Sequence, residues 1–489
     1  MKKINELFDV EEDFKIQSIH SDSRYVGKNS IFFCVDGLSV DGHKYIDDAI
    51  FQGAVCIVHS KPVEYKYPGI LYIQVEDVLD ELNRVADLFY DNHSHKMTMI
   101  GVTGSSGKTI VALMLYDLLS SMDLKMGYIG TNDIKYGGRI IQCPYTTPEV
   151  IFLHRNLSDM VKNDVKGVCI EASSHGLALK RVDGVHFDIA IFTNIYEEHL
   201  DFHGTMQHLV NSKKKLFERL DEKGYAILNT DEVGFYVAVK DDIKGHIITY
   251  GIEHSADIMA RNIELFIDHA HFMLQIDDHV YEVDVPVLGI FNVSNVLAVV
   301  ATLKALDLPI EDIIEAITHI KQVDGRMELI ENPYGFHVIV DYCQHINSYK
   351  AVFEFAKRVR KKGRIIAVFG APEKKNYAKR AQLGKLADEY VDQVILTAED
   401  HRDESVYDIA NDIQQYINRP VSVIIEDRGI AIEQAISIAN KDDIILILGK
   451  GHEQFMASTI GNEPYSGDKY IAKRAIRKYF SEGEDEDEL

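Results

Sequence analysis

The 489-residue sequence lacks the features that mark secreted, membrane-spanning or zinc-binding proteins. It has no tryptophan, an absence that carries no functional information. Its five cysteines are odd in number, scattered and without CxxC spacing, which argues against a disulfide framework or a zinc site. No stretch approaches about 18 uninterrupted apolar residues, and the opening MKKINELFDVEEDF lacks the apolar core of a signal peptide. We therefore expect a cytoplasmic protein with reduced thiols and no membrane partner.

Basic residues are also in deficit. The chain has 52 Lys and Arg against 77 Asp and Glu, a formal net charge of −25. An acidic surface of this kind disfavours nucleic acid or an anionic membrane as the main partner. It does not exclude small anionic substrates, because a few local cations outweigh the global field at close range.

Length and composition favour a protein of several globular domains. At about 150 residues per domain the length suggests three domains. The apolar fraction of 46% and the charged fraction of 26% provide enough material for buried cores and exclude a mainly disordered chain. Only the acidic tail, SEGEDEDEL at 481–489, is expected to be solvated and disordered.

Alternating strand-like and helix-like segments predict an α/β protein of three domains. The first, residues 1–95, is a small α/β domain with the short apolar runs SIFFCV and AVCIV, and the polar DNHSHK follows as a linker. The second, 96–324, opens with MTMIGVTG and continues through GVCIEA, DIAIFTN and YAILNT, which predicts a parallel sheet. The third, 325–489, contains five buried-type strands and is expected to be Rossmann-like: HVIVDY, RIIAVFG, QVILTAED, VSVIIEDR and DIILILGK.

The segment GSSGKT, residues 104–109, lies between a predicted strand and a predicted helix. Such a glycine-rich turn directs backbone N–H groups toward phosphate, and the helix N-terminus adds partial positive charge. Lys108 would reach the β- and γ-phosphates and the Thr109 hydroxyl would ligate Mg²⁺. The longer GxxxxGK[ST] pattern is not met because position 102 is Val, so an ordinary turn is the alternative. The predicted nucleotide-binding residues of this loop are Gly104, Ser105, Ser106, Gly107, Lys108 and Thr109.

In its context, GVTGSSGKT, this loop resembles that of the Mur ligase family, and the resemblance extends along almost the whole chain. DSR (22–24) and DGHKYI (41–46) are similar to the uridine-nucleotide domain of the members that add the third residue of the stem peptide. Further family motifs follow in order: TTPE (146–149), EASSHGL (171–177), FTNIYEEHLDFHGTM (192–206), KKLF (214–217), LGIFNVSN (288–295), DGRME (324–328), VDY (340–342) and GKGHE (449–453).

The resemblance implies an ATP-dependent amide ligase of peptidoglycan precursor synthesis. In the family, the γ-phosphoryl group of ATP passes to a substrate carboxylate, and an amine then displaces phosphate from the acyl phosphate. The implied cofactors are ATP and Mg²⁺. The implied partners are small molecules only, UDP-N-acetylmuramoyl-L-alanyl-D-glutamate and a diamino acid, and the chain is expected to act as a monomer. Positioning and charge neutralisation dominate such chemistry.

The resemblance also assigns residues to roles. The catalytic set would be Lys108, Glu171, His199 and Lys213, with Thr109, Glu171 and His199 as Mg²⁺ ligands and Lys213 as N6-carboxylysine, a carbamate supporting a second Mg²⁺. From spacing alone, Lys213 would lie on a solvated basic helix face. Glu198 replaces the aspartate usual before this histidine. The UDP-substrate would contact Ser23, Thr146, Thr147, Ser173 and Arg181. Beyond the loop, ATP would contact Asn295, Arg326 and Asp341.

For the acceptor amino acid the resemblance points to Lys375, Glu399, Asp400, Arg402, Gly449 and Glu453. EDHR (399–402) replaces the family's DNPR but keeps Arg402, which in the family recognises the distal carboxylate of meso-diaminopimelate, so this acceptor is favoured over L-lysine. Lys375 replaces an arginine and Gln344 a histidine. Two alternatives stay open: a Mur-type ligase with another acceptor or substrate, and a nucleotide-binding regulatory protein without ligase activity. The DSR and DGH segments argue against a folylpolyglutamate-type ligase.

Overall fold

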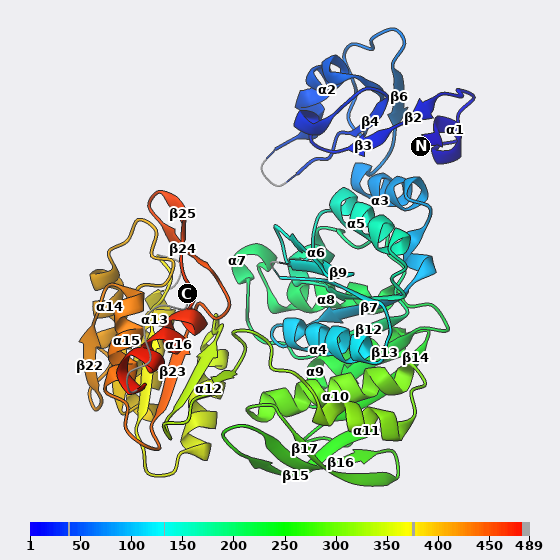
Figure 1. The fold of residues 1–489 in the computed structure, drawn as a ribbon. Coiled ribbons are helices and arrows are strands. Elements are labelled where there is room, and N and C mark those ends of the chain that lie inside the picture. Colours follow the sequence, from blue (N-terminus) through cyan, green and yellow to red (C-terminus); the bar gives the residue numbers. More distant parts are fainter. Residues whose placement is uncertain (38–39, 132, 374–376, 482–489) are drawn as a thin grey trace. The chain divides into compact units, whose positions relative to one another are not determined.

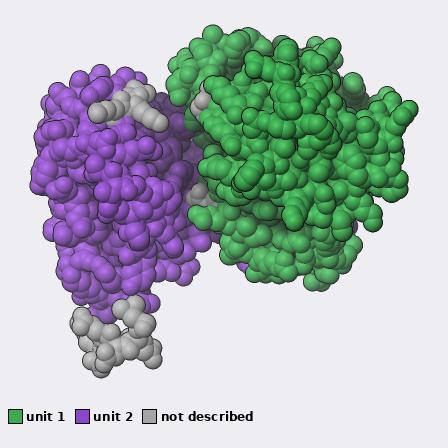
Figure 2. All heavy atoms as spheres, turned by 90° about the horizontal axis from the view of Figure 1, so that it is seen from above, with its two compact units in different colours: residues 1–256, 298–308 green, residues 257–297, 309–489 purple. Residues whose placement is uncertain are grey.

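The computed structural model describes residues 1–37, 40–131, 133–373 and 377–481 (Figure 1). The chain divides into two compact units, coloured separately in Figure 2. Unit 1 comprises residues 1–256 and 298–308, and unit 2 comprises residues 257–297 and 309–489. The predicted domain boundaries at 95/96 and 324/325 remain predictions.

The first part of unit 1 is a small α/β layer. Its parallel sheet has the order β3 (Ser18–His20), β4 (Ser30–Phe33), β5 (Ala54–His59) and β6 (Leu71–Gln74). A short antiparallel pair, β1 (Lys2–Lys3) and β2 (Lys15–Ile16), and the helices α1 (Ile4–Leu7), α2 (Ile46–Gln52) and α3 (Val78–Phe89) accompany it. The two apolar runs predicted as strands are β4 and β5, and both are largely buried.

A larger sheet occupies the rest of unit 1. Its strands follow the order β10 (Arg139–Gln142), β9 (Asp133–Tyr136), β8 (Met126–Ile129), β11 (Gly167–Glu171), β7 (Thr98–Thr103), β12 (Ile189–Phe192), β13 (Tyr225–Asn229) and β14 (His246–Gly251). The six strands from β8 to β14 are parallel, as predicted, and β9 and β10 form an antiparallel edge. The helices are α4 (Lys108–Ser121), α5 (Val150–Lys162), α6 (Ser174–Ala178), α7 (Leu200–His203), α8 (Met206–Glu218) and α9 (Val233–Val239).

The strand order brings distant segments to one sheet edge. Because β7 lies between β11 and β12, the loops that follow these three strands emerge side by side at their carboxyl ends. The GSSGKT segment follows β7, Glu171 is the last residue of β11, and the FTNIYEEHL segment begins at the last residue of β12.

Unit 2 begins with an antiparallel meander that the sequence did not lead us to expect, formed by β15 (Ile258–Leu265), β16 (Ala270–Ile276) and β17 (His279–Val285). Helix α10 (Ile290–Ala305) crosses the division between the units, and α11 (Ile310–Thr318) follows. In β16 every second residue is buried, so its apolar residues alternate with half-exposed ones.

The main sheet of unit 2 is doubly wound. Its order is β18 (Glu328–Ile330), β19 (His337–Asp341), β23 (Ile444–Leu448), β20 (Ile365–Phe369), β21 (Gln393–Leu396) and β22 (Val421–Ile424), and all pairs except β18–β19 are parallel. Helices α12 (Ile346–Val359), α13 (Tyr377–Tyr390) and α14 (Val406–Gln414) pack into one core, while α15 (Arg428–Ser437) and α16 (Asp468–Phe480) pack into another. Residues of β20 enter the two cores alternately, so helices cover both faces, as predicted for a Rossmann-like domain. A hairpin, β24 (Phe455–Ser458) with β25 (Gly461–Pro464), completes the unit.

All five cysteines are buried and free, as the sequence predicts. Within the described ranges, no helix is both long enough and apolar enough to cross a membrane.

Candidate active site

The GSSGKT segment forms a tight loop between β7 and α4. Gly104 has a φ of +151°, and a Cβ there would lie 1.8 Å from the Thr193 hydroxyl oxygen. Gly107 has a φ of +83° at the start of α4. Lys108 Nζ donates to the carbonyls of Gly104 and Ser105 at 2.8 and 3.1 Å, so the lysine lies across its own loop. The loop therefore has the close turn that glycine permits and an N-terminal helix end suited to an anion.

Asn194, which follows β12, fixes the shape of this loop. The Ser105 N–H donates to the Asn194 carbonyl and the Ser106 N–H donates to its side-chain oxygen, both at 2.9 Å. The hydroxyls of Ser106 and Tyr196 are also in contact. These two amides are thus engaged by the protein, which leaves the first N–H groups of α4 as the anion donors.

Glu171 ends β11 and is fully buried, and its carboxylate accepts four hydrogen bonds. The Tyr128 hydroxyl at 2.5 Å and the Thr131 N–H at 2.9 Å donate to Oε1. The hydroxyls of Thr109 and Thr131 donate to Oε2 at 2.8 and 3.2 Å. The predicted partners Thr109 and Glu171 are therefore in direct contact, and hard oxygen donors of this kind suit Mg²⁺.

Lys213, on α8, is completely buried rather than part of a solvated helix face. Its Nζ donates to Glu198 Oε1 at 2.8 Å. Burial lowers the pKa of Lys213 to about 8, against the opposing attraction of Glu198. Burial alone would raise the pKa of Glu198, but the charges of Lys213 and Lys108 outweigh it and lower that pKa to about 2. The site thus contains a buried amine held by an ionised carboxylate.

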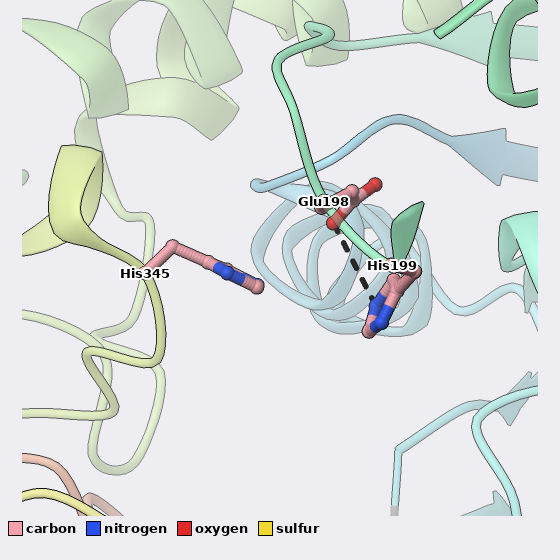
Figure 3. Close-up of side chains that lie close together, drawn as sticks. All are labelled: Glu198, His199 and His345. Carbon is pink, nitrogen blue, oxygen red and sulfur yellow. Dashed lines mark ion pairs between the residues drawn. The ribbon is translucent and has the colours of Figure 1, made fainter. Parts of the chain in front are cut away.

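His199 is the N-cap residue of α7 and has a positive φ of +50°. Figure 3 shows its side chain next to that of Glu198. Its Nε2 lies 3.8 Å from Glu198 Oε2, and its ring contacts that of His175 with 4.6 Å between centroids. Burial lowers the pKa of His199 despite the neighbouring carboxylate. A neutral imidazole is the form that ligates a metal. His345, also drawn in Figure 3, belongs to unit 2.

Most of the residues predicted to hold the UDP-substrate adjoin Glu171. The Thr147 hydroxyl donates to the Glu171 carbonyl at 2.7 Å, accepts from the Ser173 N–H at 2.9 Å and contacts the Ser173 hydroxyl at 3.0 Å. Arg181 donates to the Thr147 carbonyl at 2.9 Å, and its guanidinium lies 4.4 Å from the centre of the Tyr145 ring. The Thr146 and Thr131 hydroxyls are 3.2 Å apart.

Ser23 lies apart from these residues, in the sheet region of residues 1–74. It is buried in a 3₁₀ turn, Ser23–Tyr25, and the Asp22 carboxylate caps that turn by accepting from the Arg24 N–H at 3.0 Å.

The residues predicted to contact ATP beyond the loop lie in unit 2 by the compact division. Asn295 is buried in α10 and donates to the Asn292 side chain at 2.9 Å. The Arg326 guanidinium stacks 4.4 Å from the Tyr342 ring centre. Asp341, at the end of β19, accepts from the Met327 N–H at 2.7 Å and from the Cys343 thiol at 2.9 Å. Burial raises the pKa of Asp341.

Five of the six predicted acceptor residues belong to the described part of the chain, and they follow the ends of β21 and β23. Glu399 is 1% exposed and burial raises its pKa, while a Cβ on Gly449 would lie 2.4 Å from its Oε2. Asp400 and Arg402 both have positive φ, and the Arg402 N–H donates to the Ala457 carbonyl at 3.1 Å. The Tyr342 hydroxyl donates to Glu453 Oε1 at 2.9 Å. Lys375 lies outside the described residues.

Gln344, where the family has histidine, contacts the loop that follows β23. Its side-chain amide donates to the Gly449 carbonyl at 2.9 Å, and its backbone carbonyl accepts from Lys379 Nζ at 2.9 Å. The substitution therefore keeps a hydrogen-bonding side chain at this position.

Four residues of these surroundings were missed in the sequence. Tyr128 contacts Glu171 from the neighbouring strand β8 and Thr131 from the loop after it, and no local motif marks them. Arg428 is buried behind the ends of β21 and β23. Lys450 is buried between Asp400 and Glu453. Of these four residues, only Lys450 could have been found from the sequence, because it lies inside the GKGHE motif.

Known protein families match three segments of the chain. Residues 15–90 match the Mur ligase family catalytic domain, 102–303 the Mur ligase middle domain, and 325–451 the Mur ligase glutamate ligase domain. The UDP-N-acetylmuramoyl-L-alanyl-D-glutamate–2,6-diaminopimelate ligase of Caldanaerobacter subterraneus subsp. tengcongensis is 37% identical over 442 residues, 90% of each chain. The UDP-N-acetylmuramyl-tripeptide synthetase of Borreliella afzelii is 36% identical over 478 residues, 95% of this chain and 94% of its own.

Comparison with solved structures shows a similar fold. A solved UDP-N-acetylmuramoyl-L-alanyl-D-glutamate–2,6-diaminopimelate ligase superposes with a TM-score of 0.73 at 24% identity, covering 98% of this chain and 99% of its own. The order of the motifs, the phosphate loop between β7 and α4, and relatives more than 30% identical along most of their length agree. The chain belongs to the Mur ligase family, with its three-domain α/β architecture.

Proposed function

We propose that the chain is an ATP-dependent amide ligase that adds meso-diaminopimelate to UDP-N-acetylmuramoyl-L-alanyl-D-glutamate in peptidoglycan precursor synthesis. The observation that carries this proposal is the grouping, in unit 1, of the phosphate loop, the Thr109–Glu171 contact and the buried Lys213–Glu198 pair. The relative from Caldanaerobacter, named for this reaction, supports the choice of substrates. The enzyme would act as a cytoplasmic monomer on small molecules alone.

ATP would bind with its phosphates over the N-terminus of α4, where Lys108 is placed to leave the Gly104 carbonyl and neutralise phosphate charge. Thr109, Glu171 and His199 would hold Mg²⁺. The donors fit that ion, because the Thr109 hydroxyl already lies 2.8 Å from a carboxylate oxygen of Glu171. Bound there, the ion would neutralise charge on the transferring phosphoryl group. Asn295, Arg326 and Asp341 would contact the nucleoside.

Lys213 would carry a carbamate. Its buried amine has a pKa lowered to about 8, so a fraction is uncharged near neutral pH and can attack CO₂, forming an N–C bond and releasing a proton. The product is an anion in a position now held by a cation. The carbamate and the Glu198 carboxylate would then be two adjacent anions that need a cation between them, and a second Mg²⁺ would supply it.

The UDP-substrate would lie along Thr146, Thr147, Ser173 and Arg181, with Ser23 at its uridine end. Arg181 offers a guanidinium for a carboxylate or phosphate. The acceptor would bind at the loops 399–402 and 449–453, with Arg402 reading its distal carboxylate. In this arrangement the acceptor amine attacks the acyl phosphate and phosphate leaves.

A second candidate keeps the chemistry and changes the acceptor. Asp400 and His401 differ from the family's asparagine and proline, and the Borreliella relative carries a name that specifies no acceptor. A non-catalytic regulatory role has less support, because the Thr109–Glu171 and Lys213–Glu198 contacts are both present.

The test is a ligation assay with purified protein, ATP, Mg²⁺, the UDP-muramoyl dipeptide and a panel of amino acids, followed by phosphate release and product mass. We expect a product with meso-diaminopimelate. No phosphate release with any acceptor would refute the ligase proposal, and release confined to another amino acid would establish the second candidate.

The carbamate is tested with Lys213→Ala, which should be inactive and regain activity with a short-chain carboxylate. Lys214→Ala is the matched control, because Lys214 is the next residue on the same helix and pairs at the surface with Asp242. Full activity of Lys213→Ala would remove the carbamate from the mechanism.

A further inference from the structure

The imidazole of His199 lies on a short and partly exposed segment of unit 1. Its side chain is 45% exposed, and the helix that it caps, α7, has only four residues (Figure 3). Exposed side chains change rotamer rapidly, on the scale of picoseconds to nanoseconds. A metal ligand needs a fixed ring orientation, which residues behind it normally provide. We therefore looked for what holds this ring.

The ring of His175 contacts His199 from a different loop. The two ring centroids are 4.6 Å apart and the planes meet at 79°, which is an edge-to-face contact. His175 also packs against Phe202, inside α7, with 4.3 Å between centroids. A single ring thus contacts both the proposed ligand and the helix that follows it.

The backbone that carries His175 is closely packed. His175 is the second residue of α6, whose N-cap Ser173 accepts from the Gly176 N–H at 3.1 Å. A Cβ on Gly176 would lie 2.5 Å from the Thr147 Cβ, so α6 packs tightly against the neighbouring loop. The helix begins three residues after Glu171, another proposed Mg²⁺ ligand. His175 is therefore a well-supported contact for a less well-supported ligand.

The same group of rings reaches α8. The His203 ring lies 5.5 Å from that of His175, and its Nδ1 is 3.5 Å from the Ser212 hydroxyl oxygen. Ser212 directly precedes Lys213 on α8. The rings thus connect α6, α7 and α8, and His175 lies at their centre because it contacts three of the other rings.

We propose that His175 is a positioning residue for His199, whose imidazole it holds in one orientation by ring packing and not through its own nitrogens. An aromatic contact of this kind is worth about three- to tenfold in an equilibrium constant. Loss of the His175 ring should therefore weaken metal binding without removing a ligand. This inference rests on the Mg²⁺ site of the proposed function and deepens it.

The experiment measures binding of Mn²⁺, used as a probe for Mg²⁺, from the electron paramagnetic resonance signal of the free ion. This measurement on the full-length protein needs no turnover. His175→Ala removes the ring, so the Kd for Mn²⁺ should rise about three- to tenfold. His175→Phe keeps a ring without nitrogens and should stay within about twofold of the parent.

A kinetic measurement separates positioning from a general loss of structure. In His175→Ala the Mg²⁺ concentration for half-maximal ligation should rise in the same proportion as the Kd for Mn²⁺. The KM for the UDP-substrate should stay within about twofold, because it reports whether Ser173 and Thr147 remain in place around α6. A rise in this KM equal to the rise in the Mg²⁺ requirement would overturn the positioning role.

His186→Ala is the matched control. His186 also packs its ring on another histidine of unit 1, His95, with 4.5 Å between centroids, but neither ring belongs to the group around His199. Its removal should leave the Kd for Mn²⁺ unchanged. If His175→Ala does not fold, His175→Leu keeps apolar volume without a planar ring, and the same weakening is expected.

The outcomes separate this inference from the proposed function. A parent-like Kd in His175→Ala overturns the inference and leaves the ligase function standing. Equal weakening in His175→Ala and His175→Phe assigns the effect to the imidazole nitrogens, and equal weakening in His186→Ala makes it unspecific, so either result also overturns it. A parent protein that binds Mn²⁺ but ligates no amino acid refutes the ligase function alone, and one that binds no Mn²⁺ overturns this inference.

Discussion

Replacement of Arg428 by methionine should strongly destabilise unit 2. The Arg428 side chain is 1% exposed and that of its partner Asp468 is fully buried. Arg428 donates to the two Asp468 oxygens at 2.8 and 2.7 Å, to the Leu448 carbonyl at 2.9 Å and to the Ala398 carbonyl at 3.3 Å. The variant Arg428→Met loses all four hydrogen bonds.

The loss of stability in Arg428→Met depends on how the buried Asp468 carboxylate is left. Asp468 would keep only the Tyr465 hydroxyl at 2.7 Å among its side-chain donors in the described chain, and its charge would be buried without a counter-ion. Removing one partner of a buried ion pair costs about 3–5 kcal/mol of unfolding free energy. The protein has no tryptophan, so the assay is urea unfolding followed by circular dichroism at pH 7.

The control is Arg474→Met on the neighbouring helix α16. Arg474 pairs with Glu433 at 2.6 Å but is 51% exposed, so its removal should cost less than about 1 kcal/mol. If Arg428→Met costs no more than this control, our reasoning about the buried pair is wrong.

A kinetic consequence accompanies the loss of stability. Ala398 and Leu448 directly precede Glu399 and Gly449, so Arg428 holds the starting points of both acceptor loops. At a temperature where the variant is folded, KM for the acceptor should rise while KM for ATP is retained. Equal changes in both constants would show that Arg428 supports the fold alone.

Three further predictions concern unit 1. Gly104→Ala places a methyl group 1.8 Å from the Thr193 hydroxyl oxygen, so KM for ATP should rise about tenfold in steady-state kinetics, and an unchanged value would show that the loop tolerates the group. Glu171→Gln keeps the shape but not the charge, so activity should fall on the order of 10–100-fold with a raised Mg²⁺ requirement, and a parent-like Mg²⁺ titration would contradict that role. Burial lowers the pKa of His154 to about 4, so the unfolded state binds the extra proton and stability falls as the pH drops below about 6.5. The free energy of unfolding in urea should fall between pH 7 and pH 5 by about 2 kcal/mol more in the parent protein than in His154→Phe. The same fall in both proteins would contradict this prediction.

Local pattern was sufficient to predict the phosphate loop and the buried strands. GSSGKT, between an apolar run and a helix-like stretch, is a loop between β7 and α4, and five largely apolar runs are five strands of the unit 2 sheet. These features depend on residues close in the sequence, which is why they are readable from it.

The surroundings of Glu171 were not predictable in the same way. Tyr128 and Thr131 reach its carboxylate because β11 pairs with both β7 and β8, and strand order is not encoded in any short segment. Lys213 illustrates the same limit, since three successive lysines read as a solvated helix face. Only the packing of α8 shows that the first of the three is buried.

The five buried cysteines allow local unfolding of the protein to be followed by thiol labelling. Cys34 and Cys56 lie in the sheet region of residues 1–74, Cys143 and Cys169 in or beside the larger sheet of unit 1, and Cys343 in unit 2. Burial raises the pKa of the Cys34 thiol to about 12, and the thiol must become a thiolate and reach solvent before an alkylating agent can modify it. Each labelled cysteine, located by peptide mass, would therefore time the unfolding of its own part of the chain without any introduced probe.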